Sequence, residues 1–121
     1  MVRVFVWFFI FSAFVVSMLA SDPQRIVFLT GDEEYRSEES MPMLAKILRR
    51  DFGFHVSVGF SLDENGSVDP NAASSLTRTE ELKDADLMVL FLRFRRPDEA
   101  SFQHILDYLK SGKPVVGFRT S

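Results

Sequence analysis

The sequence contains no cysteine, and this absence excludes several kinds of chemistry at once. A chain without thiols has no disulfide, no thiolate metal site, no lipid attachment at cysteine and no cysteine nucleophile. Basic clusters are also absent, since the densest run comprises only Arg93, Arg95 and Arg96 and the formal net charge is -3. We therefore expect no nucleic-acid partner, because nucleic-acid surfaces of proteins are strongly basic.

Histidine occurs only at His55, where a strand is expected to start, and at His104, on an expected helix. Neither has a partner at ligand spacing, so both are interpreted as structural, and no metal or cofactor is expected. The segment 63–69 is acidic, but its glycine comes too early for a calcium loop and no closing glutamate follows. Asn65-Gly66-Ser67 matches a glycosylation acceptor, although Asn-Gly is more simply a turn.

Long apolar runs are confined to the N-terminus, where residues 4–19 are almost unbroken in their hydrophobicity. Arg3 precedes this run and Ala20 closes it, which is the order of a secretory signal peptide. The run is shorter than the roughly 20 apolar residues that cross a bilayer as a helix. We expect residues 1–20 to be a signal peptide and the cleaved chain to be secreted or periplasmic, away from the membrane. Retention as an anchor is the alternative, because Met18 stands where a small residue is preferred.

Residues 21–121 alternate between short apolar runs and amphipathic stretches, which is typical of an α/β domain. Four runs are predicted to be strands, the second at a sheet edge because its residues alternate: 25–30, 55–60, 86–92 and 114–118. Three helices are expected between them, the middle one short, at about 37–52, 79–84 and 97–111. This order requires right-handed crossovers and a parallel sheet with helices on both faces.

The faces of the two longer helices follow from their spacing. In the first, Ser37 or Ser40 is the expected N-cap and Leu44, Ile47 and Leu48 are expected to share the inner face. In the last, the expected inner residues are Phe102, Ile105, Leu106 and Leu109. No helix follows the fourth strand to cover it, so residues 21–121 are interpreted as the N-terminal part of a larger domain, truncated after that strand, or as a chain that needs a partner surface.

Arginine ends two of the expected strands, with Arg93 after the third and Arg119 after the fourth. In an open parallel sheet, the carboxyl ends of the strands form the edge where ligands bind. An apolar run needs no cation at its end in order to fold, so this placement favours a site for a carboxylate, a phosphate or a polyol. Arg95 and Arg96 precede a turn and are expected on the surface, and the long segment 61–75 is a candidate lid over this edge.

Polar side chains also follow the first strand. Asp32 and Glu33 are candidate catalytic acid–base groups, and a ligand-binding set is expected at Gly31, Tyr35, Arg36, Arg93, Arg119 and Thr120. Tyr35 offers an aromatic face to a sugar ring. The alternative is a solvated acidic turn whose charges pair with Arg93 or Arg119, which is the favoured interpretation for Glu34, Glu38 and Glu39.

Three segments in order, 26–37, 85–90 and 111–120, together resemble the ThuA-like (trehalose-utilisation) family. The resemblance covers residues 25–121. That family belongs to the class I glutamine amidotransferase-like superfamily, so the resemblance implies a flavodoxin-like three-layer α/β/α sandwich and a role related to carbohydrate. It also implies that a catalytic histidine lies just beyond residue 121.

One departure from the superfamily pattern matters for the chemistry. Where the amidotransferases carry a cysteine nucleophile after the strand that resembles 113–118, this chain has Arg119. A protonated guanidinium cannot attack a carbonyl, so glutamine hydrolysis by that mechanism is excluded. Two functions stay open: an exported enzyme that acts on a sugar, and a non-catalytic module that binds a sugar or an anion, in either case within a longer chain that has further domains.

Overall fold

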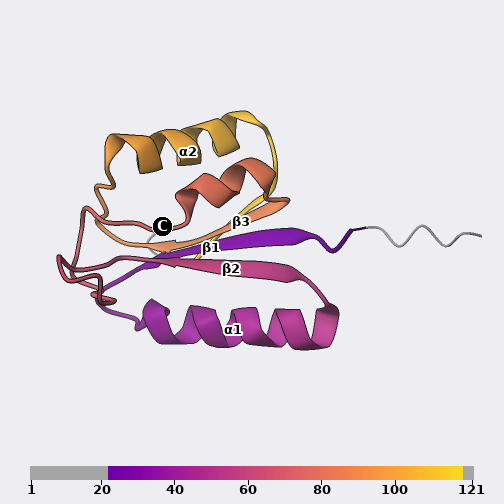
Figure 1. The fold of residues 1–121 in the computed structure, drawn as a ribbon, viewed down its shortest axis with the longest axis horizontal. Coiled ribbons are helices and arrows are strands. Elements are labelled where there is room, and N and C mark those ends of the chain that lie inside the picture. Colours follow the sequence, from indigo (N-terminus) through magenta and orange to yellow (C-terminus); the bar gives the residue numbers. More distant parts are fainter. Residues whose placement is uncertain (1–21, 119–121) are drawn as a thin grey trace, which may run out of the picture.

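The computed structural model describes residues 22–118. They form a four-stranded, all-parallel sheet in the order β2-β1-β3-β4, with helices on both faces (Figure 1). The α/β fold predicted from the sequence is therefore confirmed. This strand order equals the first four positions of the flavodoxin-like order 2-1-3-4-5. The strands are β1 Arg25–Gly31, β2 His55–Phe60, β3 Leu87–Leu92 and β4 Val115–Gly117.

β1 is buried on both faces, which explains its unbroken apolar run. Ile26 and Phe28 point to the face covered by α1, whereas Val27 and Leu29 point to the face covered by the 3-10 helix η1 and by α2. Alternate residues of β1 therefore contribute to both core clusters, one on each side of the sheet.

Helix α1, Ser37–Phe52, begins differently from the prediction. Arg36 occupies the cap position in a left-handed conformation and makes no side-chain cap, while Ser37 is the first helical residue and pairs its hydroxyl with that of buried Thr30. Both predicted caps, Ser37 and Ser40, are therefore wrong. The hydroxyl pair satisfies two buried polar groups where the chain leaves the sheet.

The inner face of α1 was predicted only in part. Met41 and Ala45 are buried, with Leu44 and Leu48 half-buried against them, but 38% of Ile47 is exposed. Ile47 lies on the flank of the apolar stripe, so the helix turns it toward solvent.

The opposite face of the sheet carries η1, Thr79–Asp84, and α2, Glu99–Lys110. The inner residues of α2 are Ser101, Ile105 and Tyr108, whereas 51% of Phe102 and 48% of Leu109 are exposed. The prediction is therefore confirmed at Ile105 and wrong at Phe102 and Leu109, while Leu106 is half-buried. The Ser101 hydroxyl can be buried because it lies 3.3 Å from the Leu76 carbonyl oxygen and 2.8 Å from the Asp98 carboxylate.

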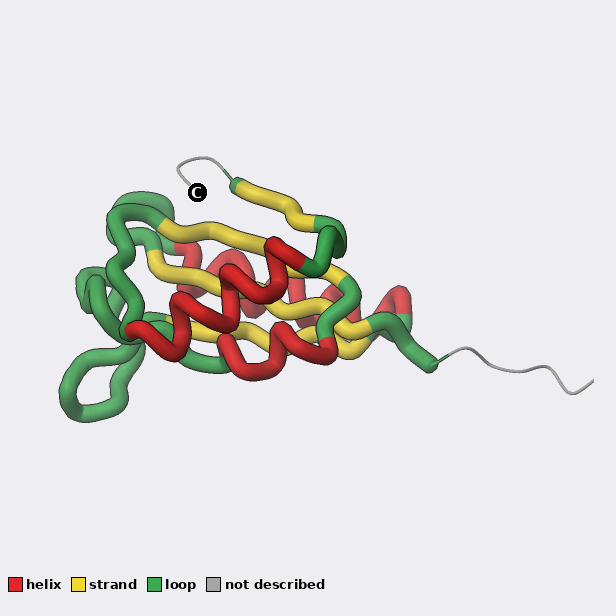
Figure 2. Tube along the Cα trace, turned by 90° about the horizontal axis from the view of Figure 1, so that it is seen from above, coloured by secondary structure: helices red, strands yellow, loops and turns green. Residues whose placement is uncertain are grey.

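β4 lies at the sheet edge beside β3 (Figure 2). Val115 and Val116 point to opposite faces of the sheet. Val115 is 39% exposed and Val116 is 45% exposed. The expected signal peptide lies outside the described residues. Among residues 22–118, no helix has the length and apolar character needed to cross a membrane.

Candidate ligand site at the carboxyl edge of the sheet

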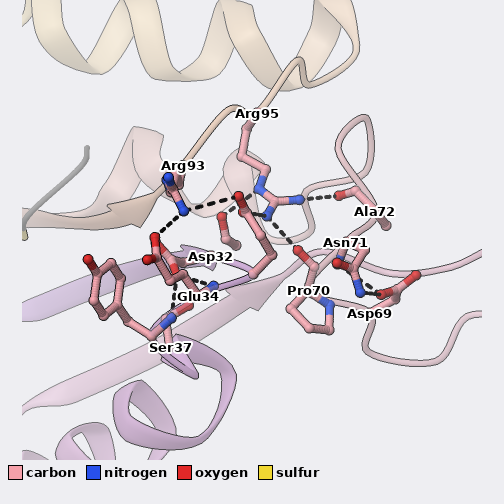
Figure 3. Close-up of polar contacts among 12 residues, drawn as sticks. Asp32, Glu34, Ser37, Asp69, Pro70, Asn71, Ala72, Arg93 and Arg95 are labelled. Atoms are coloured by element: carbon pink, nitrogen blue, oxygen red, sulfur yellow. Dashed lines mark hydrogen bonds and ion pairs between the residues drawn. The ribbon is translucent and has the colours of Figure 1, made fainter.

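Three segments that are distant in the sequence meet where the parallel strands end. The turn after β1 brings Asp32, Glu33 and Glu34, the segment after β3 brings Arg93 and Arg95, and the segment after β2 brings backbone carbonyls of residues 70 and 72 (Figure 3). We call this the carboxyl-edge cluster. The turn after β1 and the segment after β3 therefore lie together, as the sequence predicted.

Asp32 is completely buried. Its Oδ1 accepts the backbone N–H groups of Glu34 at 2.8 Å and Tyr35 at 2.7 Å, an arrangement that closes the turn after β1. The sequence singled out Asp32 as an acid–base candidate. The structure places its carboxylate in a backbone-organising role.

Glu33 and Glu34 share the guanidinium group of Arg93. Nη1 of Arg93 lies 3.4 Å from Oε1 of Glu33 and forms an ion pair with Glu34. The Arg93 side chain is 26% exposed, that of Glu33 31% and that of Glu34 50%. The rim of the cluster therefore faces solvent. This is the acidic turn paired with Arg93 that the sequence offered as the alternative.

Arg95 was expected on the surface, and that prediction was wrong. Only 5% of its side chain is exposed. Its guanidinium donates to the carbonyl oxygens of Gly31, Pro70 and Ala72, the last at 2.8 Å, and Nη2 lies 3.1 Å from Oε2 of Glu33. Arg95 thus ties the turn after β1 to the long segment after β2. Its neighbour Arg96 is exposed, as predicted.

Gly31 is surrounded too closely for a larger residue. A Cβ atom at this position would lie 2.6 Å from the Ser61 hydroxyl and 3.0 Å from Nε of Arg95. The Gly31 carbonyl oxygen accepts two hydrogen bonds, one from the backbone N–H of Arg93 at 3.0 Å and one from Nε of Arg95. Gly31 therefore serves to let three segments approach each other.

A row of aromatic rings adjoins the cluster. Phe91 of β3 stacks on Tyr35 at 6.3 Å between ring centroids and on Phe118 at 5.3 Å. Tyr35 is 38% and Phe118 36% exposed, so the row has an open surface. Sequence reasoning proposed Tyr35 but missed the two phenylalanines. Their signal was present: Phe118 is the last residue and Phe91 the second-to-last residue of apolar runs that were interpreted only through the arginines that follow.

Other candidates lie away from the cluster or outside the described residues. Arg36 pairs with Glu39 on the exposed first turn of α1. Nδ1 of His104 lies 3.1 Å from the Thr79 hydroxyl, which gives that histidine a structural partner. No group of three or more metal-ligating side chains occurs in residues 22–118. Arg119 and Thr120 lie outside the described residues.

Comparison with known proteins identified no relative: no family model, no curated protein and no solved structure matches the chain. The resemblance to the ThuA-like family therefore stays a prediction from the sequence.

Proposed function

We propose that this chain is an exported, non-catalytic domain that binds a neutral carbohydrate at the carboxyl edge of its sheet. The observation that carries the proposal is the row Tyr35, Phe91 and Phe118 beside the Arg93–Glu34 ion pair. Sugars present an apolar C–H face and a rim of hydroxyl groups. An aromatic surface next to exposed charged donors and acceptors complements both.

The charge balance of the cluster favours a neutral ligand over an anion. Arg93 already faces two carboxylates, and Arg95 is enclosed by three carbonyls and Glu33. An anionic ligand would have to displace these partners and would then lie beside the acidic groups it left unpaired. A hydroxyl group can instead accept from Arg93 and donate to Glu34 while the ion pair persists.

Binding is favoured over catalysis because both candidate acid–base carboxylates already have partners within the protein. Asp32 holds two backbone amides, and Glu33 contacts both Arg93 and Arg95. A general base needs a lone pair within reach of the substrate proton. The carbohydrate role agrees with what the ThuA-like resemblance implies, and the absence of cysteine excludes a cysteine-dependent glutaminase.

Titration calorimetry of the full chain tests the proposal, with glucose, galactose, maltose and cellobiose as neutral probes and glucose 6-phosphate as the anionic probe. We expect at least one neutral sugar to bind more tightly than the phosphate. Tyr35→Ala and Phe118→Ala should each weaken that binding by roughly threefold to tenfold, the contribution of one aromatic contact. Arg96→Ala is the matched control because its side chain is exposed and outside the cluster.

Two results would overturn the proposal. One is the absence of heat from every neutral sugar at millimolar concentration. The other is tight binding of glucose 6-phosphate that is lost in Arg93→Ala, which would identify an anion site.

A further inference from the structure

A groove runs along the outer edge of β2, on the side of the sheet away from β3 and β4. It comprises two adjoining cavities of about 460 and 760 Å³ that share Arg49, Val56, Ser57 and Glu80 among their lining residues. One wall comes from α1 and the other from η1 and the residue before it. The floor is the backbone and side chains of an edge strand, where main-chain polar groups have no neighbouring strand.

The register of the sheet determines which backbone groups face the groove. The N–H of His55 donates to Gln24 at the amino end of β1, so His55 and each second residue after it pair with β1. The N–H and C=O groups of Val56, Val58 and Phe60 therefore point outward.

Side chains cover both ends of this outward row. Arg49 of α1 donates to the Val56 carbonyl, with Nε 2.7 Å from the oxygen. At the other end, the Phe60 N–H donates to the Thr77 hydroxyl at 2.9 Å, and the Phe60 carbonyl accepts the Thr77 N–H at 3.0 Å. Within residues 22–118, the hydrogen bonds leave the outward N–H and C=O of Val58 without a partner. The middle of the strand edge thus lacks a backbone partner among these residues and borders the wider cavity, although only 7% of Val58 is exposed, and the cover at the Val56 end is the Arg49 side chain.

Arg49 forms no ion pair with the described residues, although Glu80 also lines both cavities. Its guanidinium contacts a carbonyl oxygen and no carboxylate among residues 22–118, whereas Arg78 on the opposite wall pairs with Glu81 at 2.6 Å. A carboxylate entering the groove would form the stronger, charge-assisted contact with Arg49. That contact would release the Val56 carbonyl for ladder pairing.

We propose that the outer edge of β2 binds an extended peptide segment of a partner protein as a fifth strand, selected by an acidic side chain that pairs with Arg49. Such strand addition takes affinity from main-chain hydrogen bonds and specificity from alternate side chains. Val56, Val58 and Phe60 belong to the α1-side core, so the acidic residue occupies this face beside Arg49. The next peptide residue on this face stands two positions after the acidic residue. It points toward the apolar surface of Pro42 and Phe60, which line the wider cavity.

The groove is independent of the proposed sugar site. It borders β2 between α1 and η1, whereas the carboxyl-edge cluster involves the residues after β1 and β3. Failure of sugar binding would therefore leave the peptide proposal unaffected, and the reverse also holds.

Three peptides test the proposal by ¹⁵N-resolved NMR titration of the full chain. In a parallel fifth strand, Ac-TETVTV-NH₂ places glutamate and both valines on the face of Val56 and Val58, and its threonine N–H groups donate to β2. Ac-TKTVTV-NH₂ reverses the charge, and Ac-TEPVPV-NH₂ lacks those donors at its two proline positions. We expect the first peptide to shift the amide signals of Val56 and Val58 saturably at millimolar concentration. The lysine peptide should bind about tenfold more weakly, and the proline peptide should leave those amides unchanged.

The variant Arg49→Ala separates the contribution of the Arg49 charge to peptide binding from the contribution of the backbone hydrogen bonds at the edge of β2. In this variant the glutamate and lysine peptides should bind equally, because the selecting guanidinium is gone while Val58 stays available. Equal binding of the two peptides to the unmodified chain would overturn the proposal, and so would shifts that avoid Val56 and Val58. Concentration-dependent shifts of the Val58 amide without peptide would assign the edge to a second copy of this chain and would also overturn it.

Discussion

The side chain of Arg95 is only 5% exposed, although it stands in the most basic segment of the chain. A guanidinium group has five donors in a planar fork, and here they meet three carbonyl oxygens and one carboxylate. Nothing in the local sequence distinguishes Arg95 from the exposed Arg96. The difference arises because the segment after β2 passes directly over the end of β1, which no local pattern encodes.

Replacement of Arg95 by alanine should lower the free energy of unfolding by about 2–4 kcal/mol, because buried carbonyls and Glu33 lose their partner. Arg95→Lys should recover only part of this loss, since an ammonium group cannot span the same acceptors. Urea denaturation measures both changes. Arg96→Ala is the control and should change the stability by less than about 0.5 kcal/mol; equal losses at positions 95 and 96 would contradict the buried role.

Gly31 and Ser61 allow a double-mutant cycle. Gly31→Ala should destabilise the chain by about 1–3 kcal/mol, because the added Cβ would lie 2.6 Å from the Ser61 hydroxyl oxygen. That hydroxyl is buried and has no hydrogen-bond partner among residues 22–118, so Ser61→Ala alone should be nearly neutral. In the Ser61→Ala background the cost of Gly31→Ala should fall, as thermal unfolding of the four chains would reveal. Strictly additive effects would count against the contact.

At the scale of elements, strand positions were predicted closely and helix faces were not. The expected strand at 55–60 coincides with β2, and its expected edge position is confirmed. Strands are marked by short apolar runs bounded by turns, which are local signals. The rotation of α2 buries the Ser101 hydroxyl against the Leu76 carbonyl, a partner from another segment that Ser101 gains only when the helix docks.

The N-cap of α2 should make stability depend on pH. Hydrogen bonds from the backbone and hydroxyl of Ser101 hold the pKa of Asp98 below its usual value. A lowered folded-state pKa stabilises the fold above the unfolded value of about 3.9, and this contribution is lost as the pH falls through the folded value.

Asp98→Ala should therefore lower the melting temperature clearly at pH 7 and much less at pH 2. Asp98→Asn is the matched control, since it keeps an acceptor for the Ser101 N–H without the titrating charge. Calorimetric melts across this pH range provide the measurement, and an Asp98→Ala deficit that does not change with pH would refute the assignment.

At the scale of the whole molecule, apolar surface gathers on β4 and on α2. The exposed set comprises Phe102, Leu109, Val115, Val116 and Phe118. Uncovered apolar side chains on both faces of a parallel strand are unusual, since such strands are normally covered by helices on both sides.

We expect residues 21–121 expressed alone to self-associate or to aggregate through this surface. Val115→Thr combined with Val116→Thr should reduce the association, because threonine keeps the β-branched shape and adds a hydroxyl group. Sedimentation velocity at several concentrations would measure it. A monomer with a sharp, cooperative melt would contradict the expectation.

The N-terminal run leads to a prediction about cellular location. We expect the mature chain to begin near Ser21 outside the cytoplasm, because a positive charge, an apolar run and a small residue follow one another at the start of the sequence. N-terminal sequencing of the protein from its native host would identify the first residue. An intact Met1 in the cytosolic fraction would refute export.

The sequence by itself determined the α/β class, the four strands and the acidic turn that follows β1. These features depend on apolar periodicity, turn residues and the chemistry of neighbouring side chains, all of which act over a few positions. The same local signals also placed Arg93 at the carboxyl edge of the sheet.

Tertiary structure alone decided what the polar side chains do. Asp32 became a turn-closing group, Arg95 a buried tie between two segments, and Arg49 the cover of an edge carbonyl. Each of these roles requires a partner from another segment or a burial state that folding creates. The energy of a polar group depends on its partners and its solvent exposure, and only the assembled sheet supplies both.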